Sequence, residues 1–142
     1  MLKKSILIWV LFIPLGILNG GFREMYLMTW APENYALPMS GIILCLSIFL
    51  VSYVLIPRIG KGEPEIYLKM GVLWVVLTIL VETMLGFAMG NTLTELLKAY
   101  DVMTGNFWLL VVLFVGIVPW TVVKIKEKID RRSDGLYIKE ME

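Results

Sequence analysis

The strongest indication of the fold class is the segment from Met70 to Gly90, which reads MGVLWVVLTILVETMLGFAMG. As a helix it is long enough to cross the roughly 30 Å hydrocarbon core of a bilayer. It contains a single charged side chain, the carboxylate of Glu82. A charge near the middle of a membrane helix costs about 2.5–3.5 kcal/mol on insertion scales. Such a residue is therefore usually retained because it forms an ion pair or has a function. This stretch therefore predicts a membrane helix that carries a candidate polar site.

The composition of the whole chain agrees with a membrane protein. Of its 142 residues, 58% are hydrophobic and 18% are charged, and the mean hydropathy is +0.79. A chain of this length with so few charges is too apolar for a soluble domain, so we expect an integral membrane protein whose main partner is the lipid bilayer. The 13 basic and 12 acidic residues form no concentrated basic face, so nucleic acid is not an expected partner.

Several kinds of chemistry are disfavoured by the residues that the sequence lacks. There is no histidine, which is the usual haem ligand, metal ligand and general base near neutral pH. The single Cys45 has no second cysteine with which to form a redox pair, and we interpret it as a small buried hydrophobe. We therefore expect no catalytic residues, no cofactor and no metal site.

Four apolar segments predict an all-α, integral membrane four-helix bundle over residues 1–123. The expected spans are about 5–23, 40–57, 70–89 and 107–123. A cleavable signal peptide is the competing interpretation of the first segment, but the segment is long and lacks a clear small-x-small cleavage site. Residues 124–142 are expected to form a basic, then mixed-charge cytoplasmic tail without apolar periodicity beyond its first turn or two.

The connections between the spans differ in character. Residues 25–38 contain three aromatic side chains and two prolines and predict an interfacial loop, whereas residues 58–69 predict a short polar connection. Residues 91–106 have leucines at helical spacing and predict a short amphipathic interfacial helix between the third and fourth spans, ending near Gly105.

The distribution of Lys and Arg predicts the orientation. The N-terminus carries 2 of them, the 58–69 connection 3 and the tail 6, against Arg23 and Lys98 on the other face. Positive residues concentrate on the cytoplasmic side of membrane proteins, so both termini are expected in the cytoplasm.

Polar and small residues form one narrow stripe along the third span. They lie four residues apart and are Trp74, Thr78, Glu82, Gly86 and Gly90. Residues four apart share a helix face, so we expect this stripe to face protein rather than lipid.

The outer end of the first span carries a second polar group. Asn19 and Arg23 are four apart, and Gly16 and Gly20 have a spacing that allows another helix to approach closely. Helix side chains lean toward their own N-terminus, which directs Arg23 into the membrane and toward the deeper Glu82. We expect a polar cluster in the outer half of the bundle, with a candidate outer cap above it. The cluster comprises Asn19, Arg23, Glu24, Thr78 and Glu82, and the cap comprises Lys98, Tyr100 and Asp101.

Three interpretations of this cluster stay open. It binds or permeates a small solute or ion, and permeation is then expected to need a homo-oligomer because one copy encloses little volume. Alternatively, the protein is an accessory or structural membrane protein whose cluster only fixes helix packing. A membrane enzyme acting on a lipid or quinone is the least favoured, since no Ser-His, Cys-His or metal-ligand set is present.

Four motifs also carry a resemblance to a known group of proteins. They are LNGGFRE at residues 18–24, PMSG at 38–41, WVVLTILVE at 74–82 and YDVMTGNFW at 100–108. Together they resemble an uncharacterised group of small bacterial and archaeal four-helix membrane proteins with NGxxRE, WxxxTxxxE and YDxxxGxxW motifs. The resemblance implies a shared four-helix layout and a prokaryotic cytoplasmic membrane, and it implies no activity. Members of that group carry a histidine before the serine of the second motif, where this chain has Pro38 or Met39, so a histidine mechanism is not expected.

Overall fold

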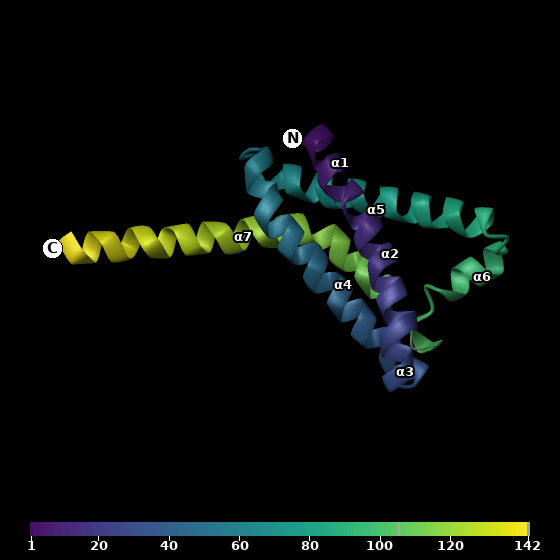
Figure 1. Ribbon diagram of the computed structural model, residues 1–142. Coiled ribbons are helices and arrows are strands. Elements are labelled where there is room, and N and C mark those ends of the chain that lie inside the picture. The colour runs from purple at the N-terminus through teal and green to yellow at the C-terminus, as the bar shows by residue number, and fades with distance from the viewer. Residues whose placement is uncertain (105, 142) are drawn as a thin grey trace.

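The computed structural model describes residues 1–104 and 106–141, and these residues form helices and short connections without any β-strand (Figure 1). Four helical stretches are long and apolar enough to cross a membrane. They are Leu2–Trp30, Glu33–Ile59, Pro64–Ala88 and Trp108–Leu136. The predicted all-α fold with four long apolar helices is thereby confirmed.

The first stretch is one nearly continuous helix built from four pieces. These are α1 (Leu2–Val10), α2 (Phe12–Phe22), the π-helix η1 (Arg23–Leu27) and α3 (Met28–Trp30). The break between α1 and α2 at Leu11 lies just before Pro14, which has no N–H to donate to the carbonyl of Val10.

The interfacial loop predicted for residues 25–38 is wrong. Only Ala31 and Pro32 interrupt the helical path, and Ala31 is extended, at φ −136° and ψ 146°, because a residue before proline is pushed out of the helical region. The next helix, α4 (Glu33–Leu55), includes Pro38 in its interior. One missing backbone hydrogen bond does not end this helix, since Ala36 and Ser40 on either side of Pro38 are buried and hold it in place.

The polar connection after α4 is short, as expected. It consists of the 3-10 turn η2 (Ile56–Ile59) and four residues outside any helix, of which Gly60 has a positive φ of 130°. The helix α5 (Pro64–Ala88) then begins with a proline in its first turn, where no backbone N–H is needed. The helix therefore starts six residues before the span predicted at 70–89.

The segment after α5 contains the expected short helix, α6 (Leu93–Lys98), followed by the 3-10 turn η3 (Val102–Thr104). The last helix, α7 (Trp108–Met141), continues beyond the fourth span predicted at 107–123 and through the basic, then mixed-charge tail. The tail has helix-forming residues and no proline, and Lys124 and Glu127 form an i,i+3 ion pair at 3.7 Å. In Figure 1 this part of α7 extends away from the other helices as a rod.

The core lies where α1, α5 and α7 meet. Trp74 of α5 is fully buried, its Nε1 donates a hydrogen bond of 3.1 Å to the carbonyl of Ser5, and its ring packs edge-on against Phe12 with centroids 5.0 Å apart. Four valines of α7, at positions 111, 115, 118 and 122, belong to this core.

The helices α5 and α7 cross at close range. A Cβ atom at Gly71 would overlap the carbonyl oxygen of Gly116, so only glycine allows these backbones to meet. Beyond this crossing α5 diverges from α2 and α4, and α6 lies between the far end of α5 and the start of α7 (Figure 1). The divergence creates the space in which the candidate site lies.

Candidate functional site

A cavity of about 410 Å³ lies between α2, α4, α5, α6 and the start of α7. Its walls are mainly apolar and aromatic, and a few polar side chains converge on it. Binding sites for small molecules are typically concave, mostly apolar and of about 300–1,000 Å³, with a few placed polar groups. The cavity has the size and lining of such a site.

The first wall comes from α2 and the start of η1. Asn19 lines the cavity, and its Nδ2 donates a hydrogen bond of 2.8 Å to the Oγ of the buried Ser40 on α4. Arg23, four residues on, also lines it and is the first residue of the π-helix. Its guanidinium lies 3.8 Å from the carboxylate of Glu24, which is exposed. Single π-turns inside helices are frequent at functional sites, because they change the direction of the side chains that follow.

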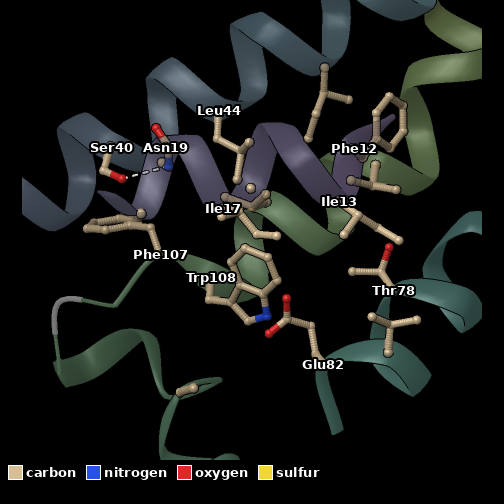
Figure 2. A pocket seen from close by; sticks show the side chains of 18 of the residues that line it. Phe12, Ile13, Ile17, Asn19, Ser40, Leu44, Thr78, Glu82, Phe107 and Trp108 are labelled. Atoms are coloured by element: carbon tan, nitrogen blue, oxygen red, sulfur yellow. Dashed lines mark hydrogen bonds between the residues drawn. The ribbon is translucent and has the colours of Figure 1, made fainter. Parts of the chain in front are cut away.

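The opposite wall comes from α5. Thr78 accepts a hydrogen bond of 2.9 Å from the Nε1 of Trp9, and both residues line the inner end of the cavity. Glu82, one turn further along α5, also lines the cavity. Figure 2 shows its carboxylate pointing toward the indole of Trp108, while Asn19 and Ser40 occupy the far side.

The outer side is closed by α6 and the residues after it, of which Leu96, Ala99 and Tyr100 line the cavity. Leu96 packs against Gly86, where a Cβ atom would overlap the leucine side chain. Within α6, the backbone N–H and then the hydroxyl of Thr92 donate to Glu95, which lowers the pKa of that carboxyl below its usual range. The capping box that these groups form starts the helix.

The structure brings together most of the residues predicted for the polar cluster. Asn19, Arg23, Thr78 and Glu82 line the same cavity, whereas Glu24 is exposed and does not. The expected contact between Arg23 and Glu82 is absent from the described residues: the guanidinium pairs with its sequence neighbour Glu24 instead.

Of the three residues predicted as an outer cap, Tyr100 alone lines the cavity. Lys98 is exposed on the last turn of α6, and the carboxylate of Asp101 accepts a hydrogen bond of 3.0 Å from the backbone N–H of Met103. Asp101 therefore shapes the turn after α6.

The glycines of α2 line the cavity, which their spacing in the sequence did not predict. Gly16 and Gly20 were predicted to allow close packing of a helix, but within the described part of the chain a Cβ atom at either position would meet nothing within 4 Å. Both line the cavity instead, so the small residues widen it. Four aromatic residues of the wall, apart from the predicted cap residue Tyr100, were not predicted either. Trp9, Phe12, Phe107 and Trp108 line it together with Tyr100.

Two polar atoms of the wall residues are buried and have no hydrogen-bond partner among the residues that the structure describes. They are the Oδ1 of Asn19 and the hydroxyl of Tyr100. Leaving such a group unpaired costs about 1–3 kcal/mol, and each unpaired group in a native structure calls for an explanation, such as a ligand or water that pairs with it. A polar molecule in the cavity would supply that partner.

The cavity does not have the ligands of a metal centre: the residues that the structure describes contain no group of three or more His, Cys, Asp or Glu side chains that could hold a metal ion. No family model, no curated protein and no solved structure matches this chain. The resemblance to proteins with NGxxRE and WxxxTxxxE motifs stays a prediction, and the function is argued from the geometry of the cavity.

Proposed function

We propose that this chain is an integral membrane protein that binds a small amphiphilic molecule in the cavity between α2, α4, α5, α6 and α7. The observation that carries the proposal is that Asn19, Arg23, Thr78 and Glu82 line one mainly apolar cavity of about 410 Å³. Apolar walls suit the body of such a ligand and the few polar groups suit its head.

The surface supports placement in a membrane. Large apolar side chains are exposed along all four long helices, for example Ile17 and Leu18 at 69%, Leu50 at 62% and Val72 at 65%. In water this exposure would promote aggregation, whereas lipid tails cover it at no cost.

The orientation proposed for the protein has both termini in the cytoplasm. The N-terminus lies beside the 58–63 connection, since Met1 is in contact with Gly60 and Gly62. This end of the molecule carries most of the Lys and Arg residues, and Figure 1 shows α3 and α6 away from it. The cavity then opens in the outer half of the membrane.

A second candidate function is that of an accessory protein whose polar groups only fix helix packing. Two hydrogen bonds favour it, from Asn19 to Ser40 and from Trp9 to Thr78, because each joins two different helices. These two hydrogen bonds do not involve the charged groups of the cavity. Arg23 and Glu82 form no hydrogen bond or ion pair across helices in the described residues, so binding explains them better than packing.

The cavity can be filled without disturbing the backbone. A side chain at Gly20 would extend into open space within the cavity, so we expect Gly20→Leu to fold and to block binding. Gly21→Leu is the matched control, since a Cβ there also meets nothing within 4 Å and the residue is not part of the cavity wall.

The probe for this test is 4-bromobenzyl alcohol, a neutral amphiphile whose bromine quenches tryptophan fluorescence on contact. Trp9 and Trp108 line the cavity, so binding should give saturable quenching in maltoside micelles. We expect saturable quenching in the wild type and in Gly21→Leu, and only the linear background of micelle partitioning in Gly20→Leu. Equal quenching of all three proteins would overturn the proposed binding site.

A further inference from the structure

We propose that the ligand is an organic cation, an alkyl- or arylammonium ion whose head lies between Glu82 and Trp108. This inference rests on the proposed function and names the chemical class of the ligand. It follows from three features of the cavity: its unbalanced charge, its aromatic wall and the kind of polar atom left unpaired.

The charge of the cavity is unbalanced on the α5 side. Arg23 and Glu82 are the charged residues of the wall, and the guanidinium of Arg23 already has the carboxylate of Glu24 at 3.8 Å. Glu82 has no ion pair and accepts no hydrogen bond within residues 1–104 and 106–141. Glu82 is exposed at the cavity among apolar side chains, and in a membrane a carboxylate in that position needs a counter-charge, which a cationic ligand supplies.

The wall is rich in aromatic rings, which attract cations through their negative faces. Five aromatic residues surround the cavity, and Figure 2 shows Glu82 and Trp108 pointing toward each other with the apolar side chains of Ile17 and Leu44 nearby. Aromatic side chains are the typical partners of quaternary ammonium groups in proteins, and Trp108 is the aromatic residue that Figure 2 shows beside Glu82. Hard inorganic cations instead need six or more oxygen ligands, which this wall does not offer.

The unpaired polar atoms also favour a cation over an anion. The Nδ2 of Asn19 is already used to bond Ser40, so the atom of this side chain that lacks a partner is the acceptor Oδ1. The hydroxyl of Tyr100 can accept as well as donate. Asn19 lies on the side of the cavity away from Glu82, so its free acceptor is not part of the site for the ammonium head, but an unpaired acceptor in the wall disfavours an anionic ligand.

Three probes that share a 4-bromobenzyl group and differ in the charge of the head test the inference. They are 4-bromobenzyltrimethylammonium, neutral 4-bromobenzyl alcohol and anionic 4-bromophenylacetate, each titrated against the purified protein in maltoside micelles with tryptophan quenching as the readout. The signal of Gly20→Leu is subtracted as the background of micelle partitioning. We expect the cation to bind at least about tenfold more tightly than the alcohol.

The variant Glu82→Gln keeps the size of the side chain and removes its charge, so it should bring the affinity for the cation down to that for the alcohol. Glu65→Gln on the same helix is the matched control, because Glu65 is exposed, pairs with Lys69 at 2.8 Å and is not part of the cavity wall. It should keep the preference for the cation.

The outcomes separate the two proposals. Equal or weaker binding of the cation in the wild type, or a preference that survives in Glu82→Gln, overturns the inference while the binding site stands. This comparison in the wild type does not depend on the folding of any variant. If none of the probes shows saturable quenching that Gly20→Leu removes, the proposed function itself fails.

Discussion

At the scale of single residues, polar side chains of the helices have two distinct uses. Some join helices directly: Trp9 donates to Thr78 across 69 positions of sequence, and Asn19 donates to Ser40. Others, chiefly Glu82, face the cavity without a partner among the described residues. The first kind contributes to stability, whereas the second kind costs stability and is better explained by binding.

The hydrogen bond between Trp9 and Thr78 gives a prediction at this scale. In Thr78→Val the indole N–H of Trp9 loses its acceptor in a half-buried position, so the free energy of unfolding should fall by about 1 kcal/mol. Unfolding in mixed micelles with increasing dodecyl sulfate measures this change.

Thr121→Val is the control for that prediction. The hydroxyl of Thr121 bonds only the carbonyl of Ile117 in its own helix, so its loss should change the free energy of unfolding by less than about 0.5 kcal/mol. In a Trp9→Phe background, which already lacks the indole N–H donor, Thr78→Val should lower the free energy of unfolding by a smaller amount. Equal effects of Thr78→Val in both backgrounds would show that the hydrogen bond contributes nothing.

At the scale of elements, the crossing of α5 and α7 sets the shape of the site. The two backbones touch at Gly71 and Gly116, and α5 turns away from α2 beyond that point. The far end of α5 is held instead by α6, through the contact of Leu96 with Gly86. The cavity therefore exists because α5 packs on α7 at one end and on α6 at the other.

A methyl group at the crossing should separate the helices. Gly71→Ala would place a Cβ against the backbone carbonyl of Gly116, which cannot move as a flexible side chain can, so we expect a loss of about 1–3 kcal/mol in the free energy of unfolding. The same substitution at Gly21, where the space is open, should leave the stability unchanged or raise it slightly. A loss at Gly71 no larger than that at Gly21 would refute the close crossing.

At the scale of the whole molecule, the arrangement of charge agrees with the arrangement of the helix ends. The residues near Met1, the 58–63 connection and the tail carry most of the Lys and Arg, while α6 lies at the opposite end of α5. Since positive residues concentrate on the cytoplasmic side of membrane proteins, we predict that the first end faces the cytoplasm and that the cavity lies in the outer half of the membrane.

Cysteine labelling tests this orientation in intact cells. In a Cys45→Ser background, Thr94→Cys on α6 should react with a membrane-impermeant maleimide, whereas Glu63→Cys before α5 should react only after the cells are opened. Both positions are exposed, and neither substitution changes the number of Lys or Arg residues. The reverse pattern would invert the proposed topology.

The fold class and several polar residues of the cavity wall could be predicted from the amino-acid sequence alone. Apolar length identified the four long helices, and four-residue spacing placed Thr78 with Glu82 and Asn19 with Arg23 on common faces. These features depend on the period of the helix, so they can be read locally. The local patterns gave wrong helix ends, for example the loop predicted up to Pro38, which lies inside α4. A proline in the sequence does not show whether its neighbours are packed tightly enough for the helix to continue through it.

The tertiary structure alone shows that these helix faces border a cavity. It also shows which hydrogen-bond partners the polar side chains have. The spacing of Gly16 and Gly20 suits a tight helix contact and an open wall equally well, and the difference arises because α5 diverges from α2 beyond its crossing with α7. The pairing of Trp9 with Thr78 and the proximity of Trp108 to Glu82 likewise depend on contacts between distant segments. Such contacts are set by the packing of whole helices, which no local period in the sequence encodes.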